Sequence, residues 1–201
     1  MKSNMLKITL ATIALALVAG CFNEPTPAYK TVKDGQRLYF SDKGLHNLAA
    51  LDGLTPEVDY LNLDRNNLTN ITPIAEMSGL KWLRLNDNKL DSLPDLSKLV
   101  SLKRIYLKNN KFASVPEELR NLPSLTDIEL SGNPIAEIPQ WLSEKQGLLH
   151  LSFSHTKLTK LPQNLEAWKS LRSLQLIGLD ALTLEEMHRI RKALPKTAVV
   201  Y

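Results

Sequence analysis

The side chains that could carry out chemistry are few, and their spacing forms no familiar catalytic or metal-binding group. His150 and His155 are the two histidines closest in sequence, but five residues of extended chain separate them by about 16 Å, too far to bind one metal ion. Asp127 and Glu129 lie two residues apart and could imitate a catalytic carboxylate pair, although surface charge on a strand is the commoner explanation. The sequence has no G-x-S-x-G, no H-E-x-x-H and no phosphate-binding glycine loop. We therefore expect no catalytic residue, no metal and no cofactor.

Cys21 is the only cysteine in the chain, so the fold contains no intramolecular disulfide. Lys2 and Lys7 precede an uncharged apolar run over 8–18, which is shorter than the roughly 20 residues that span a bilayer. A positive start followed by a short apolar run is typical of a signal peptide. The residues V-A-G-C at 18–21 resemble the lipobox of bacterial lipoproteins. This resemblance implies a lipoprotein signal peptide over 1–20, removed by cleavage, and acylation of Cys21. An ordinary signal peptide with an unrelated cysteine is the alternative.

The residues after Cys21 indicate how the protein would attach to a membrane. Several acyl chains, such as palmitate, on one cysteine would hold it firmly, because one chain alone binds only marginally. By analogy with enterobacterial lipoproteins, Phe22 in place of an aspartate favours the outer membrane. The analogy leaves both a periplasmic and a surface-facing domain open. The segment 21–34 contains two prolines and few apolar residues, which is typical of an extended tether. Its last part, Tyr29 to Val32, is expected to cover the first edge of the domain.

Length and charge indicate one domain without a nucleic-acid partner. Cleavage before Cys21 leaves 181 of the 201 residues, enough for a single domain with a sizeable core. Removing Lys2 and Lys7 from the 25 basic residues leaves 23 against 21 acidic ones, a net charge of +2. The sequence shows no basic stripe of the kind that nucleic-acid binding needs.

One pattern, L-x-x-L-x-L-x-x-N-x-L-x-x-L, organises the chain and is clearest over 80–93. Its centre alternates with period two and predicts a strand, and the flanking leucines return the chain over the same core. The strand starts recur in steps of 22 or 23 residues, and a weaker copy begins at Gly35, which makes seven coils over 35–182. The asparagine is expected to bond backbone groups where the chain leaves the strand. It occurs in four coils, as Asn66, Asn88, Asn110 and Asn133.

This period and pattern resemble the leucine-rich repeat family, whose repeats have about 20–29 residues. The second half of several coils reads L-P-x-x-L or a close variant, which resembles one subtype of the family. Proline fixes φ and lacks a backbone donor, so this half is expected to form short helical or 3₁₀ turns. The resemblance implies an α/β leucine-rich repeat solenoid, or horseshoe, with a parallel sheet on the concave face and short helical turns on the convex face.

The C-terminal residues, 183–201, predict a cap for the last coil. Thr183 stands three residues before Glu186, the spacing of a capping box, and predicts a helix that ends near Ala193. Leu184, Met187, Ile190, Arg191 and Leu194 share one face, which would cover the last coil. The residues TAVVY after Pro195 predict a short closing strand.

Solenoids of this kind bind partners on the concave face, where the side chains between the strand leucines point. Four of the eight tyrosines and tryptophans fall on that face in four adjacent coils, with arginines and a lysine among them. Tyrosine, tryptophan and arginine are enriched at binding hot spots, although strands favour aromatic residues in any case. A sugar ligand is another interpretation of the same aromatic residues. The predicted partner-binding residues are Tyr39, Tyr60, Asn62, Trp82, Arg84, Arg104, Tyr106, Lys108, Asp127, Glu129 and His150.

The sequence therefore predicts a lipid-anchored, non-enzymatic leucine-rich repeat protein of the bacterial envelope that recognises an unidentified protein. The alternative is a structural lipoprotein that organises the envelope without a specific ligand.

Overall fold

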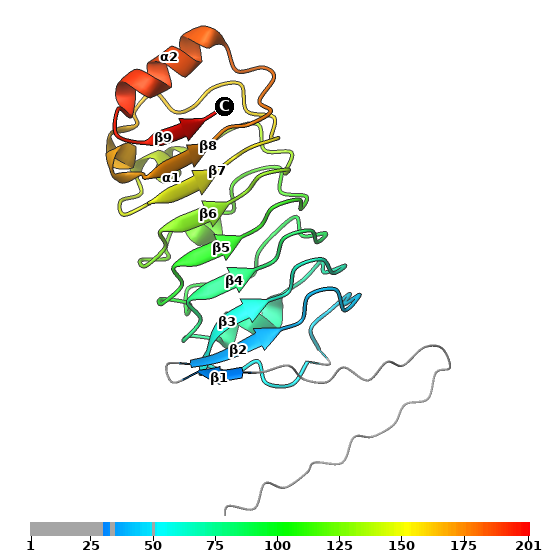
Figure 1. The fold of residues 1–201 in the computed structure, drawn as a ribbon. Coiled ribbons are helices and arrows are strands. Elements are labelled where there is room, and N and C mark those ends of the chain that lie inside the picture. The colour runs from blue at the N-terminus through cyan, green and yellow to red at the C-terminus, as the bar shows by residue number, and fades with distance from the viewer. Residues whose placement is uncertain (1–29, 33–34, 50) are drawn as a thin grey trace, which may run out of the picture.

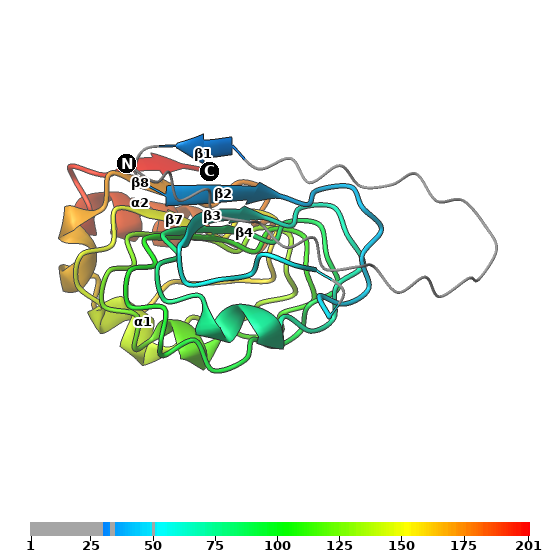
Figure 2. The ribbon, with the colours of Figure 1, turned by 90° about the horizontal axis from the view of Figure 1, so that it is seen from below.

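The computed structural model describes residues 30–32, 35–49 and 51–201, which form a stack of coils with one sheet running through it (Figure 1). The strands are hydrogen-bonded in sequence order, each to the next. Seen along the stack, the sheet lines one side of the coils and short helices line the opposite side (Figure 2). Within the described residues the strands are β1 (Lys30–Val32), β2 (Gly35–Tyr39), β3 (Val58–Asn62), β4 (Trp82–Arg84), β5 (Arg104–Tyr106), β6 (Asp127–Glu129), β7 (His150–Ser152), β8 (Ser173–Gln175) and β9 (Ala198–Val200).

Strands β2 to β9 are parallel, and their register places equivalent repeat positions side by side. Leu61 lies beside Leu83, and Leu83 lies beside Ile105, so the central positions form a column across the sheet. These three side chains have no solvent-exposed surface. The predicted solenoid with a parallel sheet and buried leucine columns is confirmed. Each coil buries its leucines against the coils above and below, which is why a single copy of the pattern would not fold alone.

The asparagine of the repeat bonds four backbone groups and joins adjacent coils; for Asn110 one of the four is the Lys108 carbonyl, at 3.2 Å. Asn110 Nδ2 donates to the carbonyls of Leu85 and Leu107 at 2.9 and 3.0 Å, and its Oδ1 accepts from the N–H of Leu90 at 3.0 Å. Asn88 and Asn133 repeat this arrangement one coil before and one coil after. These asparagines are buried. They satisfy polar groups that would otherwise be unpaired inside the protein, as the sequence predicted.

The residue just before the asparagine position has a left-handed backbone in every coil. The φ angles there lie between 53° and 70°. In this conformation the backbone N–H donates to a backbone carbonyl of the next coil. Arg65 donates to the carbonyl of Asn86, Asp87 to that of Lys108, and Asn109 to that of Ser131, at 2.8–2.9 Å. Glycine, asparagine and aspartate tolerate this region best. The residues at this position are Asp42, Arg65, Asp87, Asn109, Gly132, His155 and Gly178.

The convex side carries short helices, as the proline-containing half-repeats predicted. They are the 3₁₀ helices η1 (Thr72–Glu76), η2 (Glu117–Leu119) and η3 (Glu166–Ser170) and the α-helix α1 (Gln140–Glu144). Two tryptophans join these turns: Trp141 Nε1 donates to Glu117 Oε1 at 2.7 Å, and Trp168 Nε1 donates to the Leu142 carbonyl at 2.8 Å. Both side chains are buried. Two of the three tryptophans therefore have structural roles far from the concave face.

The cap consists of α2 (Leu184–Ala193) and β9, which pairs with β8. Thr183 accepts from the Glu186 N–H at 3.2 Å, which confirms the predicted helix start. The other half of a capping box is not seen, because the Glu186 carboxylate instead accepts from the Leu161 N–H at 2.8 Å. Ile190 and Leu194 cover the last coil as expected, with 0 % and 2 % of their surface exposed. The expectation for Leu184 was wrong, because this side chain is 75 % exposed. Arg191, predicted on the same face, is exposed as well.

At the opposite end, β1 pairs antiparallel with β2, Lys30 beside Arg37 and Val32 beside Gly35. The strand falls within the segment 21–34 that the sequence assigns to the tether, and it covers the first edge of the parallel sheet, as expected for the stretch that ends at Val32. An edge strand without such cover would present unpaired backbone groups to other chains.

Candidate concave binding surface

The strand residues between the buried leucines form two rows across the sheet. Register places Arg37, Tyr60, Trp82, Arg104, Asp127, His150 and Ser173 in the first row. The second row contains Tyr39, Asn62, Arg84, Tyr106, Glu129, Ser152 and Gln175. Ten of the eleven predicted binding residues belong to these rows, and Lys108 follows β5 two residues after Tyr106. The structure thus brings the predicted residues together on one face.

Aromatic rings and guanidinium groups pack together over strands β2 to β5. The Tyr60 ring lies 5.2 Å from the Tyr39 ring and 5.9 Å from the Trp82 ring, measured between centroids. The Arg104 guanidinium lies over the Trp82 ring at 4.4 Å, and the Arg37 guanidinium lies over Tyr60 at 5.9 Å. Cation–π contacts of this kind fix both partners in place. The result is a continuous aromatic and cationic area, which we call the aromatic half of the concave face.

Arg84 is fixed from two sides. Its guanidinium lies 5.3 Å from the Tyr106 ring centroid, and both Nε and Nη2 reach Asp64 Oδ2, at 2.7 and 2.6 Å. Asp64 is 2 % exposed, and its other oxygen accepts from the Asn86 N–H at 2.8 Å. These contacts satisfy the hydrogen-bonding capacity of the buried carboxylate. Arg84 is therefore a positioned donor and not a freely moving surface side chain.

Asn62, predicted as a binding residue, has a local structural role. Its Oδ1 accepts from the Asp64 N–H at 2.9 Å, which shapes the turn after β3. Tyr60, beside it on the same strand, is partly withdrawn from water, and this burial raises the pKa of its phenol above the ordinary value of 10.0. The Tyr60 hydroxyl is thus neutral at pH 7 and can act as an uncharged hydrogen-bonding group.

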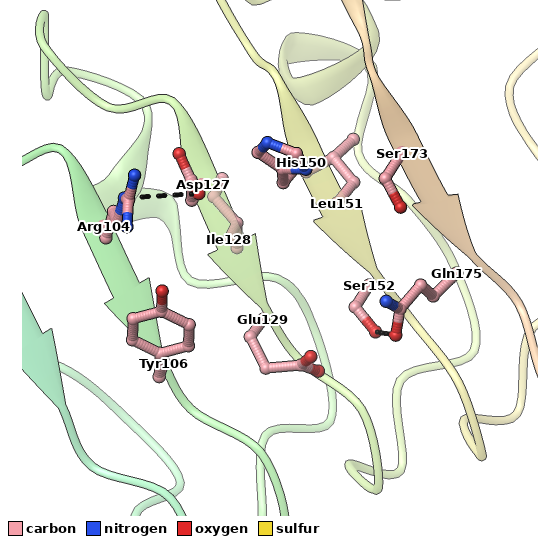
Figure 3. A pocket seen from close by; sticks show the side chains of 10 residues that line it. All are labelled: Arg104, Tyr106, Asp127, Ile128, Glu129, His150, Leu151, Ser152, Ser173 and Gln175. Atoms are coloured by element: carbon pink, nitrogen blue, oxygen red, sulfur yellow. Dashed lines mark hydrogen bonds and ion pairs between the residues drawn. The ribbon is translucent and has the colours of Figure 1, made fainter. Parts of the chain in front are cut away.

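The second half of the face, over β5 to β8, contains a hollow of about 290 Å³ (Figure 3). Asp127 is 9 % exposed; its carboxylate accepts from the Thr126 hydroxyl at 2.6 Å and lies 3.5 Å from Arg104 Nε. Glu129 is half-buried, and its Oε1 accepts from the Ser131 N–H at 2.7 Å. We call this region the acidic hollow. Its lining residues are Arg104, Tyr106, Asp127, Ile128, Glu129, His150, Leu151, Ser152, Ser173 and Gln175.

The histidines show no metal-binding arrangement in the structure. His150 is exposed on the concave face, whereas His155 occupies the left-handed position of its coil and lies against Gly178. Among residues 30–32, 35–49 and 51–201, no three histidine, cysteine or acidic side chains are grouped closely enough to hold a metal ion.

Cys21, the predicted lipidation site, lies outside the described residues. No helix within the described part of the chain has the length and apolar character needed to cross a bilayer.

Sequence reasoning missed two contributions to the face. It did not identify Asp64 as the buried partner of Arg84. It also left Ser152, Ser173 and Gln175, which line the acidic hollow, out of the binding set. The repeat register was the available signal, because Asp64, Asn86 and Lys108 share one repeat position. The side-chain oxygens of Asp64 and Asn86 each accept from the backbone N–H at the same position of the next coil.

Comparisons with known proteins agree with this architecture. The family model described as leucine rich repeat matches residues 56–112 and 78–135. A solved structure of a leucine-rich repeat protein from Leptospira interrogans is similar, with 30% sequence identity and a TM-score of 0.62. The similar region covers 73% of this chain and 43% of the Leptospira chain, so this chain spans less than half of that protein's length. A search of curated proteins found no match.

The sequence match and the fold together show that this chain contains leucine-rich repeats and forms a leucine-rich repeat solenoid. Leucine-rich repeat domains generally mediate protein–protein interaction, and the extended concave face is the surface that such solenoids use for binding.

Proposed function

We propose that this protein is a non-enzymatic recognition module of the bacterial envelope, held to a membrane through acylated Cys21, that binds a protein partner on its concave face. The aromatic half carries this proposal. Tyrosine, tryptophan and arginine are the residues that most often dominate binding energy at protein interfaces, and here they occupy adjacent strands on one open surface.

The packing of these side chains supports recognition over a purely structural role. The leucine columns and the asparagine bonds already hold the coils together, and both lie away from the concave face. Arg84 and Arg104 are held by ring and carboxylate contacts while 37 % and 39 % of their side-chain surface stays exposed. Side chains fixed before binding lose little conformational entropy when a partner docks.

The lipid anchor and the outer membrane are part of the proposal on the strength of the V-A-G-C motif and Phe22. An envelope protein with a short tether and a concave binding face would hold a partner close to the membrane surface.

The double variant Trp82→Ala/Arg104→Ala tests the recognition function. We expect the immobilised variant to lose most of the saturable capture of an envelope protein that the wild type shows, because the central ring and its cation are removed together. Its melting transition should stay close to that of the wild type, since neither side chain is part of the leucine core.

Arg120→Ala is the matched control, because Arg120 is an exposed arginine on the convex side. Capture by this variant should equal that of the wild type. If the double variant captures the same protein with unchanged affinity, the concave face is not the binding surface. Weak, salt-sensitive retention without saturation in the wild type would instead support an envelope-organising role.

A further inference from the structure

The three carboxylates of the concave face differ in their ion pairs. Asp64 is paired with Arg84 at 2.6 Å, and Asp127 lies 3.5 Å from Arg104. Within the described part of the chain, Glu129 has no lysine or arginine within ion-pairing distance. The acidic hollow thus contains two carboxylates and one guanidinium, and the guanidinium is already directed to Asp127.

Glu129 is held in one orientation. Its Oε1 is fixed by the Ser131 N–H at 2.7 Å, and the side chain is half-buried. Figure 3 shows the carboxylate lying between Tyr106 and the Ser152–Gln175 pair, consistent with the register of β5 to β8. A carboxylate that is oriented and partly shielded from water attracts a cation more strongly than an exposed, freely rotating one.

The neighbours of Glu129 suit a cation that also donates hydrogen bonds. The Ser152 hydroxyl is hydrogen-bonded to the Ser131 hydroxyl at 2.6 Å and donates to Gln175 Oε1 at 3.4 Å. Hydroxyl and amide oxygens therefore lie on the β7 and β8 side of the carboxylate. The Tyr106 ring gives an apolar wall for an aliphatic stem. A hollow of about 290 Å³ is at the lower end of ligand-pocket sizes and fits one long side chain better than a whole small-molecule ligand.

We propose that the acidic hollow receives a basic side chain, arginine or lysine, of the protein partner, and that Glu129 forms the ion pair with it. This inference rests on the proposed protein-binding function and assigns the chemistry of one contact within it. The aromatic half then supplies the apolar and stacking contacts, while the hollow fixes the register of the partner along the sheet. An acidic side chain would be repelled by Glu129 and would find Arg104 already paired.

A pair of short peptides tests this assignment. The probes are acetyl-Gly-Arg-Gly-amide and the same peptide with citrulline, which has the shape of arginine without its charge. We expect the arginine peptide to shift the backbone amide resonances of Glu129, Ser131, Ser152 and Gln175 saturably in NMR titrations of the purified protein. The citrulline peptide should shift them much less, because it lacks the charge that Glu129 attracts.

Glu129→Gln should weaken binding of the arginine peptide by about three- to tenfold, as expected for one partly shielded ion pair. Glu137→Gln is the matched control, since Glu137 is an exposed acid of the same coil, and it should bind like the wild type. Equal shifts from both peptides, or a titration unchanged in Glu129→Gln, would overturn the assignment. Tighter saturation by spermidine than by the arginine peptide would assign the hollow to a free polyamine and would also overturn it.

Partner capture separates this inference from the proposed function. If Glu129→Gln captures the partner like the wild type while Trp82→Ala/Arg104→Ala does not, the concave face binds protein but the hollow takes no basic side chain. If both variants still capture the partner and the arginine peptide still binds at Glu129, the proposed function of the concave face fails. The affinity of the hollow for a basic side chain would still stand.

Discussion

At the scale of single residues, the adjacent asparagines Asn109 and Asn110 have different structural roles. Asn110 is buried and bonds four backbone groups in two coils. Its neighbour Asn109 is exposed, has a φ of 53° and donates to the Asp87 carboxylate at 2.7 Å. The first residue is needed for its side-chain amide, and the second for its tolerance of a left-handed backbone. Their positions in the repeat, one residue apart, account for the difference.

We expect Asn110→Ala to lower the free energy of unfolding by about 2–3 kcal/mol, because the Leu90 N–H loses its acceptor inside the protein and the Leu85 and Leu107 carbonyls each lose one of two asparagine donors. Urea unfolding measures this change. Asn109→Gly should stay within about 1 kcal/mol of the wild type, because glycine adopts the left-handed conformation without strain. A similar loss in both variants would mean that the asparagine bonds between coils do not stabilise the fold.

The repeat made such residues predictable, because a position that recurs at a fixed period has one structural role throughout. The structural role of Asn110 follows from the pattern alone. The pairing of Asp64 with Arg84 does not, because it depends on two unlike side chains on neighbouring coils and on the rotamer that each adopts. For the same reason the sequence predicted the concave surface residue by residue but not the hollow between them.

At the scale of elements, α2 is joined to the solenoid by polar bonds as well as by apolar packing. Glu186 accepts from the Leu161 N–H at 2.8 Å and from Arg189, whose Nη2 also donates to the Leu161 and Pro162 carbonyls at 3.1 Å. In the same N-terminal half of the helix, the Tyr201 hydroxyl donates to the Met187 carbonyl at 2.9 Å. Local sequence gave the start of this helix correctly. The partner of Glu186 lies 25 residues away, beyond the reach of a capping motif.

The Glu186 carboxylate gives the cap a defined pH dependence. The Arg189 hydrogen bonds hold the pKa of Glu186 below its ordinary value of 4.5. Because the folded pKa is lower than the unfolded one, the carboxylate adds stability above about pH 4.5, and this stability is lost as the pH falls through the folded pKa. We expect Glu186→Gln to lower the free energy of unfolding by about 1–2 kcal/mol at pH 7.

Thermal unfolding of the wild type and Glu186→Gln across pH 7 to pH 3 measures this dependence, and the difference between the two proteins should shrink towards the acid end. Glu185→Gln, next to it on the same helix and exposed, should match the wild type at every pH. A gap between wild type and Glu186→Gln that is the same at both ends of the range would show that the charge of Glu186 does not stabilise the cap.

At the scale of the whole molecule, the fold separates the stabilising core from the proposed recognition surface. The leucine columns and asparagine bonds run inside the coils, whereas the concave side chains point out of the sheet. Repeat spacing made this division predictable, because a period of two within each strand and of 22 or 23 residues between strands fixes which side chains face outward. The identity of the partner is not encoded in that geometry, so only its chemistry can be inferred.

The proposed membrane attachment also concerns the whole molecule, and Cys21→Ser tests it. We expect this variant to move from the membrane fraction to the soluble fraction of disrupted cells, because serine cannot carry the thioether-linked lipid that the motif implies. Wild-type protein should resist extraction by high salt. Membrane-bound Cys21→Ser protein would contradict lipid anchoring, and protease treatment of intact cells would then show on which side the domain lies.

The antiparallel strand β1 gives the first edge of the solenoid a mechanical property. Lys30 pairs with Arg37 at one end of β1, and Val32 pairs with Gly35 at the other. Tension transmitted through the residues before Lys30 would therefore load these pairs one after another, starting at Lys30, instead of all together. Peeling off three residues lengthens the connection by about 10 Å. If the protein is lipid-anchored, a pulling force between the membrane and a bound partner would first separate β1 from β2. The coils that carry the concave face would keep their shape.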